Sequence, residues 1–366
     1  MSDIFTITML LIALFVFIIG LIMPSLSRKG LFFGVRIPRE KRSQESLKNF
    51  SKAYTINHII LSIILVIICA GLHFNRQTEL AWTLFIIGMT CFMMVNYILI
   101  HYRVRKKKAE EKWMENTVET SVMDVQLKPD EGLASLWWFV IPIVIISLMV
   151  IISLSKMDSL PQQIPIHWNA RGEVDRIAQK SISSVLSLPI IQSFMTLLSI
   201  FIYIAIRISK IQLSATDPEE SKIRVIKFRR GWSAFTIGNS ILLTFMFVIP
   251  QMQILQYPIS NQLIWISFGL TFCVILGWTL YLSIHLGQGG SRVKVSNSKN
   301  DDKRMNRDDD KFWKWGSVYY NPDDPSLMIE KRFGIGWTMN FGNKWSLVVL
   351  GMLILLIAAA IIFSPQ

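Results

Sequence analysis

The sequence predicts an all-α integral membrane protein of about eight transmembrane helices, with a small, partly β cytoplasmic insert before the last helix. The chain of 366 residues is 52% hydrophobic and only 17% charged, and its mean hydropathy is +0.42. Its apolar residues also stand in long uninterrupted runs, which are typical of membrane spans and not of soluble domains. Only a small part of the chain is therefore available to form soluble domains.

Eight apolar runs are long enough to cross about 30 Å of hydrocarbon at roughly 20 residues each. They are residues 4–23, 56–74, 80–100, 136–154, 185–206, 232–250, 263–286 and 345–363. No positive charge precedes the first run, and Arg28 and Lys29 follow it. We therefore interpret the first run as an uncleaved span and not as a signal peptide.

The distribution of Lys and Arg predicts how these spans are oriented. Loops 24–55, 101–135 and 207–231 and the segment 287–344 hold 33 of the 38 basic residues. Because basic residues concentrate in cytoplasmic loops, we expect these four segments inside and both termini outside. This pattern also explains the net charge of +13 without a nucleic-acid partner, since no basic patch with stacking aromatic residues is visible.

The order of spans and loops divides the chain into five units. They are an N-terminal three-span region with basic cytoplasmic loops (1–134), a two-span unit with the outer loop 155–184 (135–210), two further spans (211–286), a cytoplasmic insert rich in aromatic residues and glycine (287–344) and the last span (345–366). The basic stretch after residue 100 is expected to extend the third span as a solvated helix near anionic lipid.

The outer loop is expected to fold back on itself as a hairpin. Two prolines keep its first half extended, and a glycine suits the turn that follows. Such a hairpin brings an imidazole, an amide and a carboxylate together. We interpret this group first as a structural knot of hydrogen bonds, and as alternatives as a recognition surface or as part of a metal site. Zinc takes three or four protein ligands, so we expect no metal here. The candidate residues are Pro165, His167, Asn169, Gly172 and Asp175.

The cytoplasmic insert carries the second group of candidate residues. Residues 316–320 predict a short aromatic strand, 321–325 a turn whose side-chain oxygens bond nearby amides, and 327–329 the return strand. The tryptophans of the insert suit the headgroup layer. The acidic run 308–310 is expected to be neutralised by neighbouring basic residues in a charged linker. The candidate residues are Tyr320, Asn321, Pro322, Asp324, Lys331, Arg332, Gly336, Trp337 and Asn340.

The first cytoplasmic loop is similar to the insert in composition. Residues 31–38 and 331–337 both combine Phe, Gly and Arg, and both lie beside a terminal span. We hypothesise that these two stretches pack together beneath the bundle and form one cytoplasmic platform.

Both motif regions resemble known families. The pattern Pro-x-His-Trp-Asn-x-x-Gly-x-x-Asp at 165–175, between two spans, resembles the signature of the SdpI-type bacterial membrane proteins over about residues 135–210. That resemblance implies a multi-pass plasma-membrane protein, with bacteriocin immunity or signalling as the activity attached to relatives. The patterns YYNPDDP and KRxGxGWTxN resemble a small C-terminal domain of unknown function that accompanies the SdpI-type domain in some bacterial proteins.

We therefore expect a bacterial immunity or sensor protein that contacts membrane lipid, an extracellular peptide and a cytoplasmic regulator. A transporter or transporter accessory subunit is the first alternative, although no span carries a charged side chain near its centre for a proton relay. A metal-dependent membrane enzyme that uses His167 is the second alternative. No serine elbow, zinc helix, phosphate loop or catalytic Cys–His pair is visible, so the sequence predicts no enzyme and no cofactor.

Overall fold

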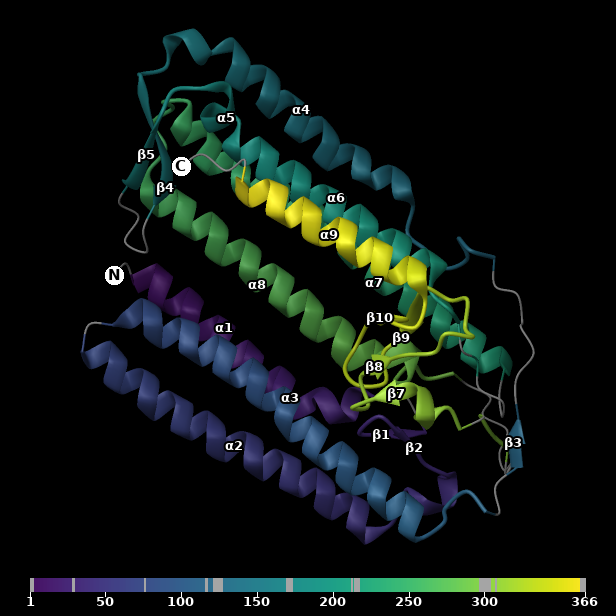
Figure 1. Ribbon diagram of the computed structural model, residues 1–366. Helices are drawn as coiled ribbons and strands as arrows, with labels where there is room; N and C mark the ends of the chain where they lie inside the picture. Colours follow the sequence, from purple (N-terminus) through teal and green to yellow (C-terminus); the bar gives the residue numbers. More distant parts are fainter. Residues whose placement is uncertain are drawn as a thin grey trace.

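The computed structural model describes residues 3–27, 30–75, 77–115, 118–120, 128–168, 174–211, 213, 218–295, 304–306 and 308–362. This part of the chain is mostly helical, and seven of its helices are long and apolar enough to cross a membrane. The long helices run side by side in one bundle, and short strand pairs lie at its two ends (Figure 1). The prediction of a multi-span helical protein is confirmed at this level.

Three helices form the N-terminal half of the bundle: α1 (Asp3–Ile22), α2 (Glu45–Phe74) and α3 (Thr78–Glu110). Asn96 ties α2 to α3, because its amide donates to the carbonyl of Tyr54 at 2.9 Å and accepts from Asn57 at 3.1 Å. Interhelical hydrogen bonds of this kind replace the hydrophobic attraction that lipid does not provide. α3 continues ten residues past the predicted span, so the helical extension predicted after residue 100 is confirmed.

The C-terminal half contains five helices and begins with a 3-10 turn at Leu136–Phe139. They are α4 (Val140–Ser155), the short α5 (Ile182–Val185), α6 (Ser187–Ile208), α7 (Pro218–Ile254) and α8 (Asn261–Leu286). A polar seam of buried groups joins α7 to its two neighbours. Gln192 of α6 donates to the carbonyl of Thr244 of α7 at 2.8 Å, and Gln251 of α7 donates to Ser153 of α4 at 2.8 Å. The predicted units 135–210 and 211–286 therefore pack as one half.

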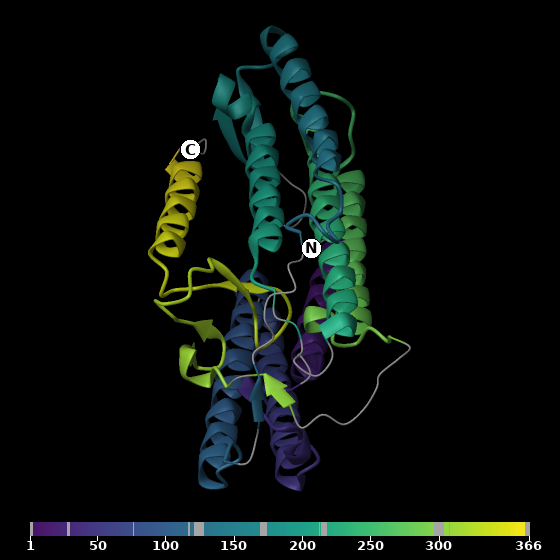
Figure 2. The same ribbon diagram turned by 90° about the vertical axis from the view of Figure 1, so that its right-hand side faces the viewer.

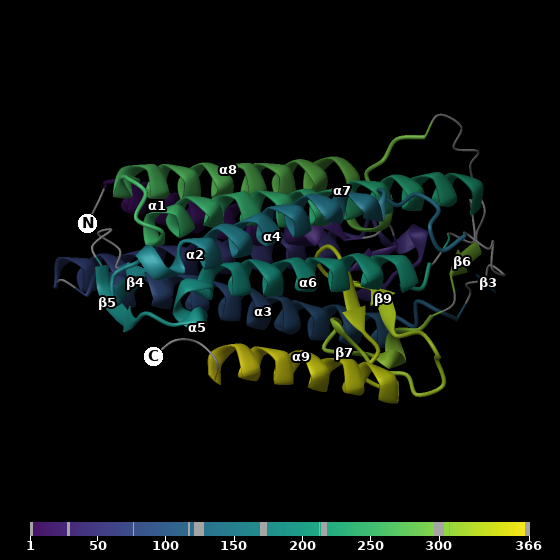
Figure 3. The ribbon, with the colours of Figure 1, turned by 90° about the horizontal axis from the view of Figure 1, so that it is seen from above.

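The two halves meet mainly where α1 packs against α8. In the view from above, α8 and α1 lie along one side of the bundle, and α9 (Lys344–Ile362) lies at the opposite edge (Figure 3). The turned view also shows α9 set apart from the other helices (Figure 2). Trp137 lies in the 3-10 turn before α4, and Trp345 lies in the first turn of α9. They have 82% and 61% of their surface exposed, which suits the headgroup layer.

Within the described residues, every strand belongs to a two-stranded sheet. The antiparallel pairs are β1 (Leu31–Phe32) with β2 (Val35–Arg36), β4 (Gln163–Trp168) with β5 (Val174–Gln179), β7 (Trp313–Lys314) with β8 (Val318–Tyr319) and β9 (Met328–Glu330) with β10 (Trp337–Met339); β3 (Val118–Thr120) and β6 (Arg304–Asn306) pair in parallel.

The insert before α9 is partly β, as predicted, but the pairing of its strands differs from the prediction. The strand expected at 327–329 is present as β9, yet it pairs with β10 and not with 316–320. β8 turns back on β7 instead, because Gly316 takes φ +71° in the connecting turn.

Candidate functional site

The outer loop forms the predicted hairpin, β4–β5, at one end of the bundle, which we call the hairpin end. Ile164 pairs with Ala178, and a bulge places His167 opposite Arg176. His167 Nδ1 lies 2.6 Å from Asp175 Oδ1, so the predicted approach of these two groups is confirmed. The two side chains are 56% and 39% exposed, and an ion pair this exposed contributes at most about 1 kcal/mol. This exposure fits a recognition surface better than the structural knot that we favoured.

The hairpin is firmly anchored to the bundle by its inner face. Ile164 is fully buried with Leu160, Val185 and Ile254. Lys180 after β5 donates to the carbonyl of Leu160 at 2.9 Å. Of the other candidate residues, Pro165 pairs with Ile177, whereas Asn169 and Gly172 lie outside the described residues.

A pocket of about 290 Å³ opens between this hairpin and the bundle. We call it the outer pocket; it is lined by Ile166 and His167 of β4, Leu188 and Ile191 of α6, Phe247 and Pro250 of α7, and Asn261, Ile264, Trp265 and Phe268 of α8. The lining is apolar except for His167 and Asn261. An apolar cavity with a few polar groups is the usual form of a ligand site.

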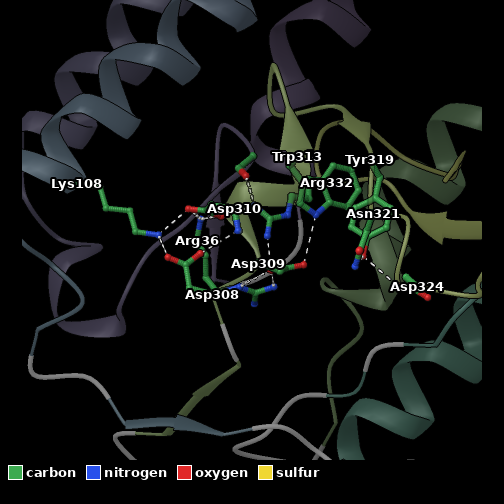
Figure 4. Close-up of polar contacts among 11 residues, drawn as sticks. Arg36, Lys108, Asp308, Asp309, Asp310, Trp313, Tyr319, Asn321, Asp324 and Arg332 are labelled. Carbon is green, nitrogen blue, oxygen red and sulfur yellow. Dashed lines mark hydrogen bonds and ion pairs between the residues drawn. The ribbon is translucent and has the colours of Figure 1, made fainter. Parts of the chain in front are cut away.

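Three aspartates and three basic residues form an ion-pair network at the opposite end, the insert end (Figure 4). The aspartates are Asp308, Asp309 and Asp310, and their partners are Arg36 of β2, Lys108 of α3 and Arg332 after β9. Lys108 Nζ lies 2.6 Å from both Asp308 and Asp310, and Arg36 Nη2 lies 2.8 Å from Asp309. Arg332 pairs with Asp309 and Asp310 and is only 4% exposed.

The prediction that the run 308–310 belongs to a charged linker is therefore wrong. The ion-pair partners that the structure describes for it come from segments far away in the chain, and Lys303 and Arg307 beside the run lie outside the described residues. Burial by itself raises the pKa of Asp310, but the attraction of Arg332 and Lys108 outweighs it and lowers that pKa to about 2. The pKa of Asp309 is lowered against the same burial by Arg332 and Arg36. Both carboxylates are thus charged partners in a compact polar core.

Arg332 also joins the two stretches that the platform hypothesis paired. Its Nη1 donates to the carbonyl of Gly34 at 2.7 Å, and its guanidinium lies 5.0 Å from the centre of the Trp313 ring. The next residue, Phe333, stacks on Tyr97 of α3 with ring centroids 3.6 Å apart. The contact predicted between residues 31–38 and 331–337 is confirmed.

The asparagines and the aspartate of the insert close a turn. Asn340 is fully buried and donates to the carbonyls of Asn321 and Asp324, each at 2.9 Å, while it accepts from the amide of Asn321 at 3.0 Å. Asp324 accepts from Tyr319 Oη at 3.0 Å and from Lys210 Nζ at 2.8 Å. These bonds give the three residues a structural role.

The other predicted residues of the insert divide between surface and core. Tyr320, Pro322 and Lys331 are exposed. Trp337, expected in the headgroup layer, instead packs against Phe228 of α7 with ring centroids 5.3 Å apart. The aromatic ring covers apolar surface between the insert and α7.

Gln288 is a key residue that the sequence analysis did not identify. It is fully buried just after α8, its Nε2 donates to the carbonyl of Gly336 at 3.0 Å, and its Oε1 accepts from the amide of Gly336 at 2.7 Å. The only signal in the sequence is its place in a glycine-rich break after a span.

We call residues 328–340, which comprise β9, β10 and the loop between them, the clasp. Through Arg332 and Phe333 the clasp holds the N-terminal half of the bundle. Through Gly336 and Trp337 it holds Gln288 and α7 of the C-terminal half. The clasp therefore bridges the two halves at the insert end.

This fold defines a helical membrane protein with short strand pairs at both ends. Within that class, a domain of unknown function (DUF1648) matches residues 144–192, and a family of unknown function (DUF5808) matches residues 322–347. The first match contains the hairpin and the second contains the whole clasp, so both overlap the predicted motif regions. Neither match covers half of the chain. No curated protein and no solved structure matches it.

Proposed function

We propose that this chain is a bacterial plasma-membrane protein that recognises an apolar extracellular peptide, for immunity or for envelope sensing. Eight spans with both termini outside fit the seven long apolar helices, the 19-residue α9 and the distribution of basic residues. The motif of the hairpin supports kinship with SdpI-type proteins. In this orientation the hairpin end faces the exterior and the insert end faces the cytoplasm.

The observation that carries this proposal is the outer pocket beneath the motif hairpin. A membrane-active peptide partitions into the interface, where the pocket lies at the ends of the spans. One branched or aromatic side chain buried there contributes about 1.5–3 kcal/mol. The exposed pair His167–Asp175 at the mouth offers polar contacts that select the peptide.

Survival of a sensitive bacterium tests this role. The protein is expressed at matched membrane levels, and the cells are challenged with secreted membrane-active peptides. We expect wild type to protect, and His167→Ala and Asp175→Ala to lose protection. Ile264→Trp, which fills the pocket, should also lose protection. Ile266→Trp should retain it, because Ile266 is 52% exposed and does not line the pocket.

Direct binding of a labelled peptide to the purified protein separates immunity from sensing. Binding without protection would support sensing alone. If no peptide binds wild type, or if Ile264→Trp and wild type bind and protect equally, the pocket is not the recognition site.

We further propose that the insert docks a cytoplasmic regulator. Tyr320 is 47% exposed although it lies within the insert motif, and Pro322 beside it is also exposed. Ala at these two positions should abolish a peptide-induced transcriptional response without changing protein level. An unchanged response would reject this docking surface.

A further inference from the structure

We infer that α8 transmits occupancy of the outer pocket to the clasp. This inference rests on the proposed recognition function and adds the regulation of that site. α8 supplies one wall of the pocket with Ile264, Trp265 and Phe268, and it is also the helix that packs against α1 of the other half. A shift of α8 therefore changes both the pocket and the contact between the two halves.

Of the three helices that line the pocket, α8 has the smallest share of its surface covered by the rest of the protein. Only 6% of its apolar window is buried inside the protein, against 39% for α6 and 33% for α7. The opposite walls are fixed, since the polar seam binds α6 to α7 and the hairpin is anchored through Ile164. A ligand larger than the pocket is thus accommodated most easily by movement of α8 into the lipid.

The inner half of α8 is packed tightly against α7. A Cβ at Gly238 would lie 2.5 Å from the ring of Trp278, and one at Gly231 would lie 2.6 Å from Leu286. The ring of Trp278 leaves no space between the two helices, whereas the contact at Gly231 is made by the flexible end of the Leu286 side chain. The region near Trp278 is therefore the natural pivot for a rigid helix whose outer half moves.

The insert end of α8 leads directly to the clasp. The helix ends at Leu286, Gly287 caps it, and Gln288 follows with its two hydrogen bonds to Gly336. The turn that carries Gln288 is held on α7 as well, because a Cβ at Gly290 would lie 2.2 Å from the carbonyl oxygen of Arg224. Movement of α8 relative to α7 therefore strains this turn and the bonds that it makes.

The size of the movement follows from the geometry of the helix. Ile264 lies about 21 Å from Trp278, and the helix end at Leu286 lies about 12 Å beyond it, at about 1.5 Å per residue. An outward shift of about 2 Å at Ile264 then displaces the helix end, and with it the turn that carries Gln288, by roughly 1.1 Å in the opposite direction. A displacement of this size along the bonds of 2.7 and 3.0 Å to Gly336 would lengthen them to about 3.8 and 4.1 Å, past the limit of a hydrogen bond at about 3.5 Å.

Loss of these bonds would loosen the loop that carries Arg332. Gly336 also accepts from the amide of Lys331 at 3.0 Å, so it closes the loop next to Arg332. The clasp would then keep its ion pairs of Arg332 with Asp309 and Asp310, but it would lose the bonds between Gly336 and Gln288 of the C-terminal half. The expected output of pocket occupancy is a clasp that holds the two halves less firmly.

Hydrogen exchange of the clasp amides tests this inference without any ligand. In the full-length protein in lipid nanodiscs, Ile264→Trp imitates an occupied pocket. We expect the amides of Lys331 and Gly336 to exchange roughly fivefold faster than in wild type, as after loss of about one hydrogen bond. Ile266→Trp adds the same side chain to the lipid-facing surface of α8 and should leave exchange unchanged. Ile191→Phe fills the pocket from α6 and should repeat the effect of Ile264→Trp.

Gln288→Ala gives the exchange rate of a clasp that has lost its bonds to the C-terminal half, because it removes both bonds to Gly336 and leaves the pocket intact. If Gln288→Ala accelerates exchange while both pocket-filling variants leave it at the wild-type rate, transmission by α8 is refuted. The proposed recognition is judged separately, by peptide binding and survival. A peptide that binds wild type without changing the exchange of the clasp amides would refute transmission by α8 and would not contradict the proposed peptide recognition.

Discussion

The insert end should depend strongly on Arg332, and Arg332→Ala measures that dependence. The network contains three carboxylates and three basic groups, so the variant leaves three negative charges with two positive partners, Arg36 and Lys108. It also removes the bond to the carbonyl of Gly34 and the contact with Trp313. Removing one partner from a buried ion pair typically costs 3–5 kcal/mol, because the other charge stays buried without compensation. We expect the free energy of unfolding to fall by about 3–5 kcal/mol.

Unfolding of the purified protein by a denaturing detergent, followed by circular dichroism, measures this change. Lys314→Ala is the matched control, because Lys314 is an exposed cation of β7 in the same insert and its loss should cost less than about 0.5 kcal/mol. The double variant Asp310→Asn with Arg332→Met should be less destabilised than Arg332→Ala, since it leaves no excess charge. If Arg332→Ala and Lys314→Ala differ by less than about 1 kcal/mol, the network behaves like a surface ion pair and the reasoning is wrong.

Three further predictions concern the same end of the protein. Gly34 has φ +76°, and a Cβ there would lie 2.3 Å from Tyr97 Oη. Gly34→Ala should therefore lower the free energy of unfolding in detergent by roughly 1–3 kcal/mol. The control Gly71→Ala should not destabilise the protein, because a Cβ at Gly71 would meet nothing within 4 Å. The pKa of Asp310 falls from 3.8 to about 2 on folding, so its ionised carboxylate contributes roughly 2 kcal/mol to the free energy of unfolding. This contribution is complete above about pH 4 and is lost as the pH falls towards 2. The thermal unfolding midpoint of wild type should therefore drop over that pH range, and that of Asp310→Asn should drop less. Asn340→Leu leaves the amides of Asn321 and Gly342 and the carbonyl of Asp324 without their partner, and it removes one of the two bonds to the carbonyl of Asn321. It should lower the free energy of unfolding by about 3 kcal/mol or more, and a loss below about 1 kcal/mol would contradict the structural role of the turn.

Features that depend on residues close together in the chain could be predicted from the sequence. Runs of about twenty apolar residues predict spans because each crosses the hydrocarbon alone, with its backbone hydrogen bonds satisfied within the helix. The hairpin of the outer loop and the approach of Asp175 to His167 followed from proline and turn chemistry over a few residues. The side-chain oxygen of Asn321, which accepts from the amide of Asp323 at 3.1 Å, was predictable for the same reason.

Contacts between groups that are far apart in the chain could be identified from the tertiary structure and not from the sequence. The chain holds 38 basic and 25 acidic residues, so composition could not show that Arg36, Lys108 and Arg332 are the partners of the run 308–310. The bonds of Gln288 to Gly336 likewise join a helix end to a loop 48 residues later. The outer pocket is formed by the packing of three helices and a strand, and no single one of them carries a signal for it. Such sites depend on how separate elements pack in space, whereas periodicity and turn chemistry describe one element at a time.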